Sequence, residues 1–151
     1  MALQIGDRAP LFTLYNDQGE KTALKDFKGK KLVLYFYPKD MTPGCTSQAE
    51  DFRDNLSKFK RKKCQVIGIS KDSIERHEKF RDKHSLNFPL LADVEGKVCE
   101  KYGVWQEKKL YGKVFMGIVR TTYIISETGR ISHVFEKVKV KGHVEAVLQE
   151  V

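Results

Sequence analysis

One continuous apolar run, residues 32–37, constrains the fold of this chain more than any other feature. All six positions carry aliphatic or aromatic side chains, with none of the alternation of a half-exposed strand. The run therefore predicts a strand that is buried on both faces. Strands of this kind lie inside mixed or parallel sheets that helices cover. Pro38 ends the run, because proline has no N–H for a central ladder.

An amphipathic helix is predicted to begin near Cys45. Ala49, Phe52, Leu56 and Phe59 recur at three- and four-residue spacing, which places them on one face of a helix, and charged residues fill the other positions. The next apolar run, residues 65–70, predicts a second buried strand. A strand, a helix and a strand in this order indicate a crossover unit of an α/β protein.

The other expected elements are shorter, and turn residues mark their ends. We expect strands at 9–15, 21–24, 88–92, 121–126 and 131–140, and helices at 74–83, 94–102 and 143–149, with Asp72 or Ser73 as the cap of the helix at 74. The first two strands form a hairpin around residues 16–19, and the last two form another around 127–130. This order predicts one domain, residues 1–151, with a thioredoxin-like fold: a mixed central sheet flanked by helices, with an N-terminal β-hairpin.

Charge and composition narrow the function classes. Lys and Arg number 28 against 20 Asp and Glu, which gives a net charge of +8, but the basic residues are scattered. We expect a basic, solvated surface rather than a specific nucleic-acid site. There is no apolar stretch of roughly 18 residues to cross a membrane. Residues 1–7 lack the pattern of a signal peptide, so a cytoplasmic location is expected.

The chain has three cysteines, Cys45, Cys64 and Cys99, and this odd, sparse count does not indicate a disulfide framework. They form neither a Cys-x-x-Cys pair nor a cluster with metal-ligand spacing, so no metal site is expected from them. We interpret the four histidines as solvated surface residues. His77 and His84, about two helical turns apart, leave a metal pair open as the alternative.

The loop that leads to Cys45 carries the chemistry. A strand ends, a tight loop follows, and a helix begins near the cysteine, so the free N–H groups of its first turn favour the thiolate. Gly44 lets the backbone pass close to the sulfur. Thr42 offers a hydroxyl within one helical turn, and Arg120 offers a permanent cation just before a predicted strand. Such a site can attack a peroxide and stabilise the departing oxygen.

These residues resemble a known family. Pro38-x-x-x-Thr42-x-x-Cys45 is similar to the active-site pattern of the peroxiredoxins. The wider segment 36–49 resembles the bacterioferritin-comigratory, or Q-type, subgroup, and residues 120–125 resemble the arginine-bearing strand of the family. The opening residues 6–12 are also similar. The resemblance extends from about residue 5 to the C-terminus.

The resemblance implies an antioxidant enzyme of cell redox homeostasis. Cys45 would reduce hydrogen peroxide or an alkyl hydroperoxide and become a sulfenic acid, with no cofactor. Pro38 would shield the sulfur, and Gln48 would help to hold the active-site network. We expect a monomer or a weak homodimer, with a hydroperoxide and a thiol reductant as partners.

The chain departs from the family pattern at the resolving cysteine. Many Q-type members carry it five residues after the peroxidatic one, where this chain has Glu50. Others carry it in the next helix, in the region of residues 80–81, which holds no cysteine here. We therefore expect a one-cysteine cycle, in which thioredoxin, glutaredoxin or glutathione reduces the sulfenic acid. A bond between Cys45 and Cys99 is the alternative, and Cys64 is interpreted as a core or surface thiol.

Two other functions are weighed against a peroxidase. A disulfide reductase would turn over protein disulfides without peroxide, but the missing Cys-x-x-Cys pair argues against it. A polyanion-binding or chaperone-like module would use the net positive charge and lose its ligand in salt. The aromatic and Met residues of segment 105–116, expected as a loop, either line the peroxide entrance or pack elsewhere.

Overall fold

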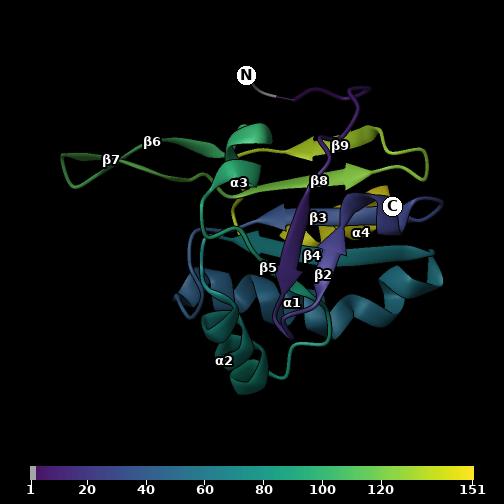
Figure 1. Ribbon diagram of the computed structural model, residues 1–151, viewed down its shortest axis with the longest axis horizontal. Coiled ribbons are helices and arrows are strands. Elements are labelled where there is room, and N and C mark those ends of the chain that lie inside the picture. Colours follow the sequence, from purple (N-terminus) through teal and green to yellow (C-terminus); the bar gives the residue numbers. More distant parts are fainter. Residues whose placement is uncertain (1–2) are drawn as a thin grey trace.

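A seven-stranded mixed sheet forms the centre of the protein (Figure 1). The computed structural model describes residues 3–151. β3, β4 and β5 run parallel, and each remaining strand of the sheet is antiparallel to the strands beside it. The spatial order is β2-β1-β5-β4-β3-β8-β9, with bounds β1 Thr13–Asn16, β2 Lys21–Ala23, β3 Lys31–Phe36, β4 Cys64–Ser70, β5 Leu90–Ala92, β8 Thr121–Ile125 and β9 Ile131–Phe135. The thioredoxin-like α/β fold, the mixed sheet and the N-terminal hairpin are confirmed.

Strand β3 divides the interior into two cores. Alternate side chains of a strand point to opposite faces. Leu32, Leu34 and Phe36 enter one apolar cluster, whereas Val33 and Tyr35 enter the other, and all five are at most 1% exposed. The prediction of a strand buried on both faces is therefore confirmed.

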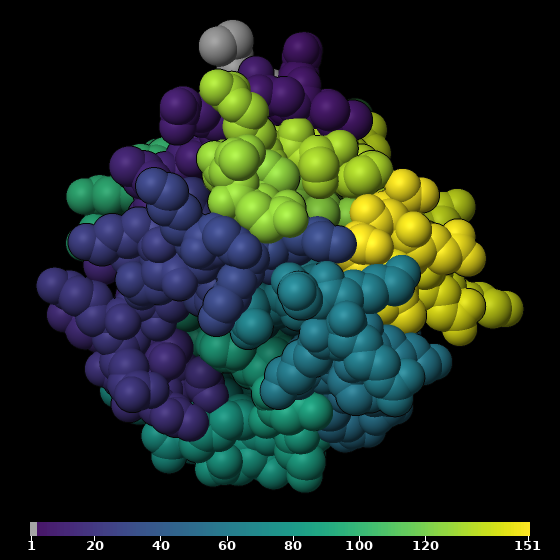
Figure 2. Space-filling model, turned by 90° about the vertical axis from the view of Figure 1, so that its right-hand side faces the viewer, coloured from purple at the N-terminus to yellow at the C-terminus, as the bar shows by residue number. Residues whose placement is uncertain are grey.

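Three helices cover one face of the sheet, and smaller elements cover the other. α1 (Pro43–Arg61), α2 (Ile74–His84) and α4 (His143–Glu150) contribute to the core that contains Tyr35. The four predicted apolar positions of α1 all lie in this core. α3 (Lys97–Lys101) and the 3-10 helix η1 (Leu24–Phe27) contribute to the opposite core. Figure 2 shows α4 beside the end of α1, where Lys62 donates to the Leu148 carbonyl at 2.8 Å.

The main error of the sequence prediction is the segment expected as a loop at 105–116. It forms a two-stranded antiparallel hairpin, β6 (Trp105–Leu110) and β7 (Lys113–Ile118), which projects from the body of the protein (Figure 1). Tyr111 and Gly112 occupy its two-residue turn with φ of 52° and 76°. Positive φ at both positions is typical of the tight turns of hairpins.

Several element bounds also differ from the prediction. The strand expected at 9–15 is limited to β1, and the strand expected at 131–140 ends at Phe135. Ser73, not Asp72, caps α2, because its side chain accepts from the Arg76 N–H at 3.2 Å. Within residues 3–151, no helix has the length and apolar character needed to cross a membrane.

His143 makes the stability of this fold depend on pH. It is 6% exposed, and its Nε2 lies 2.8 Å from the Thr122 hydroxyl on β8. Burial, and after it the charge of Arg120, lower the pKa of His143 to about 4. The unfolded chain therefore binds a proton between about pH 6.5 and 4 that the folded chain does not.

We predict that the free energy of unfolding falls as the pH drops from about 6.5 to 4, with about 2–3 kcal/mol of the loss due to His143. Urea denaturation at several pH values measures this loss. In a His143→Gln variant the curve should be flatter by that amount, because the side chain no longer titrates. Equal pH dependence in the two proteins would contradict the prediction.

Candidate active site

Cys45 lies in the first turn of α1, at the end of the loop that leaves β3. Its side chain is only 2% exposed. The helix begins at Pro43, with Thr42 as its N-cap, so proline occupies a position where a missing N–H costs little. The N–H groups of this first turn have no partner earlier in the helix, and they create a positive field around the sulfur.

Arg120 joins Cys45 and Gln48 through one guanidinium group. Its Nη2 donates to Cys45 Sγ at 3.3 Å, and its Nη1 donates to Gln48 Oε1 at 2.6 Å. Arg120 directly precedes β8, whose first residue, Thr121, pairs with Phe36 at the end of β3. This antiparallel register brings residue 120 to the point where the chain turns toward Cys45.

Gln48 and Gly44 shape the space around the guanidinium. Gln48 is fully buried, and its Nε2 has no hydrogen-bond partner among the described residues. A Cβ added to Gly44 would lie 3.3 Å from Arg120 Nη2, closer than most such contacts. Glycine at this position therefore leaves the room that the Arg120 side chain occupies.

Thr42 and Pro38 frame the loop that leads to the cysteine. The Thr42 hydroxyl donates to the Lys39 carbonyl at 2.9 Å, which leaves its oxygen lone pairs to accept a hydrogen bond. Pro38 lies two residues after the end of β3 and is half-buried. Both residues thus lie on the connection between the strand and the head of α1.

Lys108 is a further cation near the site, and sequence reasoning did not find it. It belongs to β6, and its Nζ donates to the Ile118 carbonyl at 3.0 Å, two residues before Arg120. Burial lowers the pKa of Lys108, the charge of Arg120 lowers it further, and Cys45 acts in the opposite direction. Lys108 reaches this position because it belongs to the hairpin. A sequence prediction that treats the segment as a loop therefore cannot place Lys108 near the site.

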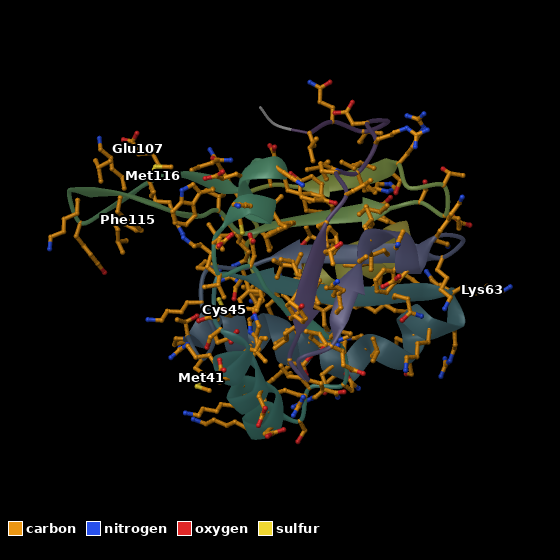
Figure 3. The ribbon with its side chains drawn as sticks, in the orientation of Figure 1. Met41, Cys45, Lys63, Glu107, Phe115 and Met116 are labelled. Atoms are coloured by element: carbon orange, nitrogen blue, oxygen red, sulfur yellow. The ribbon has the colours of Figure 1, made fainter. Side chains whose placement is uncertain are left out.

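The other two cysteines lie far from Cys45 within the fold. Cys99 belongs to the core on the opposite face of the sheet, and burial is the main cause that raises the pKa of its thiol. Cys64 shares the face of Cys45, but it follows the far end of α1, about 24 Å away along the helix. Figure 3 shows the neighbouring Lys63 at the opposite side of the protein from Cys45. Burial raises the pKa of Cys64 to about 11.

The interpretation of all four histidines as solvated surface residues is wrong for His77 and His143. His77 is fully buried and His143 is 6% exposed, because both rings face the core beneath the sheet. The structure also does not support a metal site shared by His77 and His84. His77 forms a hydrogen bond with Asp40, whereas His84 lies 3.3 Å from Glu50.

A thioredoxin-like fold that holds a buried cysteine at the head of a helix, in contact with an arginine, defines a thiol-based redox enzyme. Comparisons with known proteins agree. The model of the AhpC/TSA family matches residues 5–134. The chain is 51% identical over 149 residues to peroxiredoxin Bcp of Bacillus subtilis, which covers 99% of this chain and 95% of that protein.

Two solved structures are similar over most of the chain. PrxQ of Xylella fastidiosa, determined as a mutant, has a TM-score of 0.94 and 35% identity, and the match covers 99% of this chain and 96% of that protein. The bacterioferritin comigratory protein of Xanthomonas campestris has a TM-score of 0.88 and 39% identity, and the match covers 92% of this chain and 88% of that protein. The chain belongs to the AhpC/TSA family, as a peroxiredoxin of the Bcp/PrxQ type.

We predict that Gly44→Ala separates stability from reactivity. The added methyl group displaces the Arg120 guanidinium from Cys45, so peroxide should oxidise the cysteine several-fold more slowly. The free energy of unfolding should change by no more than about 1 kcal/mol, because the better helix propensity of alanine offsets the strain at Arg120. Stopped-flow oxidation and urea denaturation measure the two quantities. A variant that reacts at the rate of the parent protein would show that this space is not needed.

Proposed function

We propose that the protein reduces hydrogen peroxide and alkyl hydroperoxides through Cys45, and that an outside thiol completes the cycle. The contact between Arg120 and the Cys45 sulfur carries this proposal. The bacterioferritin comigratory protein of X. campestris, a relative of similar fold, has alkyl peroxide reduction activity. Both the site and this relative thus support the same reaction class.

In the first step, the Cys45 thiolate attacks the terminal oxygen of the peroxide. The S–O bond forms as the O–O bond breaks, so the cysteine becomes a sulfenic acid and the departing alkoxide takes a proton to become an alcohol. With hydrogen peroxide the second product is water. Arg120 and the helix amides would stabilise the negative charge as it moves from sulfur to oxygen.

Thr42 and Pro38 would orient the peroxide and limit the access of water. The Thr42 hydroxyl donates to Lys39, so its oxygen can accept the O–H of the substrate. Gln48 would hold the guanidinium through the 2.6 Å bond to Arg120. Gains from orientation and from fixed charges are both needed, because a thiolate alone reacts too slowly for a peroxidase.

An outside thiol is the reductant that the positions of the cysteines favour. One thiol would attack the sulfenic acid to form a mixed disulfide and water, and a second would release the Cys45 thiol and a disulfide. Thioredoxin, glutaredoxin and glutathione are suitable reductants. An internal bond to Cys99 would require local unfolding, since the two sulfurs lie in different cores.

We predict that Arg120→Ala slows the oxidation of Cys45 by about 10²–10³-fold, because one fixed donor to the developing charge is lost. Peroxide consumption with excess thiol measures the rate. Cys45→Ser is the reference for zero activity, and the rates should persist in moderate salt. Activity that survives Cys45→Ser, or a rate in Arg120→Ala equal to that of the parent protein, would refute the proposal.

A second prediction concerns the fate of the oxidised cysteine. After one equivalent of peroxide, the intact mass should rise by about 16 Da, as expected for a sulfenic acid. The same rise should occur in the Cys64→Ser and Cys99→Ser variants, because neither thiol is needed. A loss of about 2 Da that Cys99→Ser abolishes would instead establish an internal disulfide and replace the one-cysteine cycle.

A further inference from the structure

Asp40, in the loop between β3 and α1, is held by each of its polar groups. Its N–H donates to Asp72 Oδ2 at 2.8 Å, and its carbonyl accepts from Arg76 Nη2 at 3.3 Å. Its carboxylate accepts from the Tyr37 hydroxyl at 2.5 Å, and its other oxygen lies 2.6 Å from His77 Nδ1. Arg76 and His77 both belong to α2, so these contacts tie the loop to that helix.

The centre of this network is inaccessible to solvent. Tyr37 and Asp40 are 1% exposed, and His77 is fully buried. His77 Nε2 lies 2.9 Å from the Leu91 carbonyl on β5, which only accepts, so this nitrogen carries a proton. A buried polar network with all its partners in place is rigid, and it is costly to break.

The network is closed on itself rather than open to a metal ion. Asp40, Asp72 and His77 lie close enough together to hold one. However, Asp72 Oδ2 already accepts from the Asp40 N–H and the Ser70 hydroxyl, and Asp72 Oδ1 forms an ion pair with Arg76 at 2.9 Å. The arginine thus supplies the positive charge at this position.

The loop depends on such outside contacts for its shape. Met41, which follows Asp40, has a φ of 67°. This backbone conformation is energetically unfavourable for any residue that has a side chain. Its side chain is 37% exposed and lies at the surface near α2 (Figure 3). The same loop carries Pro38 and Thr42 and leads directly into Cys45. Asp40 and its partners therefore contribute to the order of this loop.

We propose that Asp40 and His77 are positioning residues that hold the Cys45 loop in its reactive shape by anchoring it to α2. The inference rests on the proposed peroxidase function. Oxidation needs the ordered loop, because Thr42 and Cys45 must meet the peroxide together. Reduction by an outside thiol needs the loop to open, since Cys45 is 2% exposed. The anchor thus favours the first half-reaction and opposes the second.

The test compares two matched substitutions. Tyr37→Phe and Tyr102→Phe each remove one buried hydroxyl that donates to one acceptor, Asp40 in the first case and the Pro10 carbonyl in the second. Tyr102 lies in the core on the other face of the sheet, so its variant measures stability loss alone. Asp40→Ala removes the anchor fully. Asp40→Asn keeps it, because the amide can donate to His77 and accept from Tyr37.

Single-turnover oxidation by cumene hydroperoxide and reduction by dithiothreitol are measured for each variant. We expect oxidation to slow by at least about tenfold in Asp40→Ala and about fivefold in Tyr37→Phe, with reduction unchanged or faster. Asp40→Asn and Tyr102→Phe should stay within about twofold of the parent protein in both steps. Hydrogen exchange should rise in the peptide that contains residues 38–45 only in the first two variants.

Three results would contradict the proposal that Asp40 and His77 anchor the Cys45 loop. They are oxidation at the parental rate in Tyr37→Phe, equal slowing of both steps in the variants, and the same behaviour in Tyr102→Phe. Because Tyr37→Phe keeps the packing of the ring, it decides the question even if Asp40→Ala does not fold. Failure of the proposed function is a separate result: the unsubstituted protein would not react with peroxide at all.

Discussion

The site depends on one guanidinium group that is shared between a sulfur and an amide. Arg120 donates to Cys45 and to Gln48, and two of its nitrogens are thereby fixed in direction. An arginine is charged at every working pH, and its planar group holds two acceptors in a defined geometry. The other features of the site serve this contact: Gly44 leaves the space, Gln48 fixes the plane, and the register of β8 against β3 brings the arginine there.

The fold keeps Cys45 apart from both other cysteines: the central sheet lies between it and Cys99, and the length of α1 lies between it and Cys64. Because residues of β3 alternate between two cores, Cys45 and Cys99 lie in different cores and are not in contact in the folded protein. Cys99 and Cys64 are both fully buried, and burial raises the pKa of each. A buried thiol in apolar surroundings is unreactive, so the fold leaves Cys45 as the thiol suited to chemistry.

The fold was predictable wherever one local pattern decided the structure. The apolar run at 32–37 and the helical spacing of Ala49, Phe52 and Leu56 correspond to β3 and α1, because periodicity reports burial directly. The β6–β7 hairpin was not predicted, because Glu107, Lys108 and Lys109 in β6 give no alternation of apolar and polar residues. Its stability comes from strand pairing and a turn, which a pattern of burial does not report.

The sequence by itself determined the order of the elements other than β6 and β7, the cysteine at the head of a helix and the family of the chain, because these depend on residues close together along the chain. The tertiary structure decided the rest. It set the contact of Arg120 with a cysteine 75 positions earlier, the placement of Cys99 in the other core, and the burial of His77 against Asp40. Each of these depends on which strands pair and which face a helix covers, and such long-range geometry leaves no periodic trace in the amino-acid order.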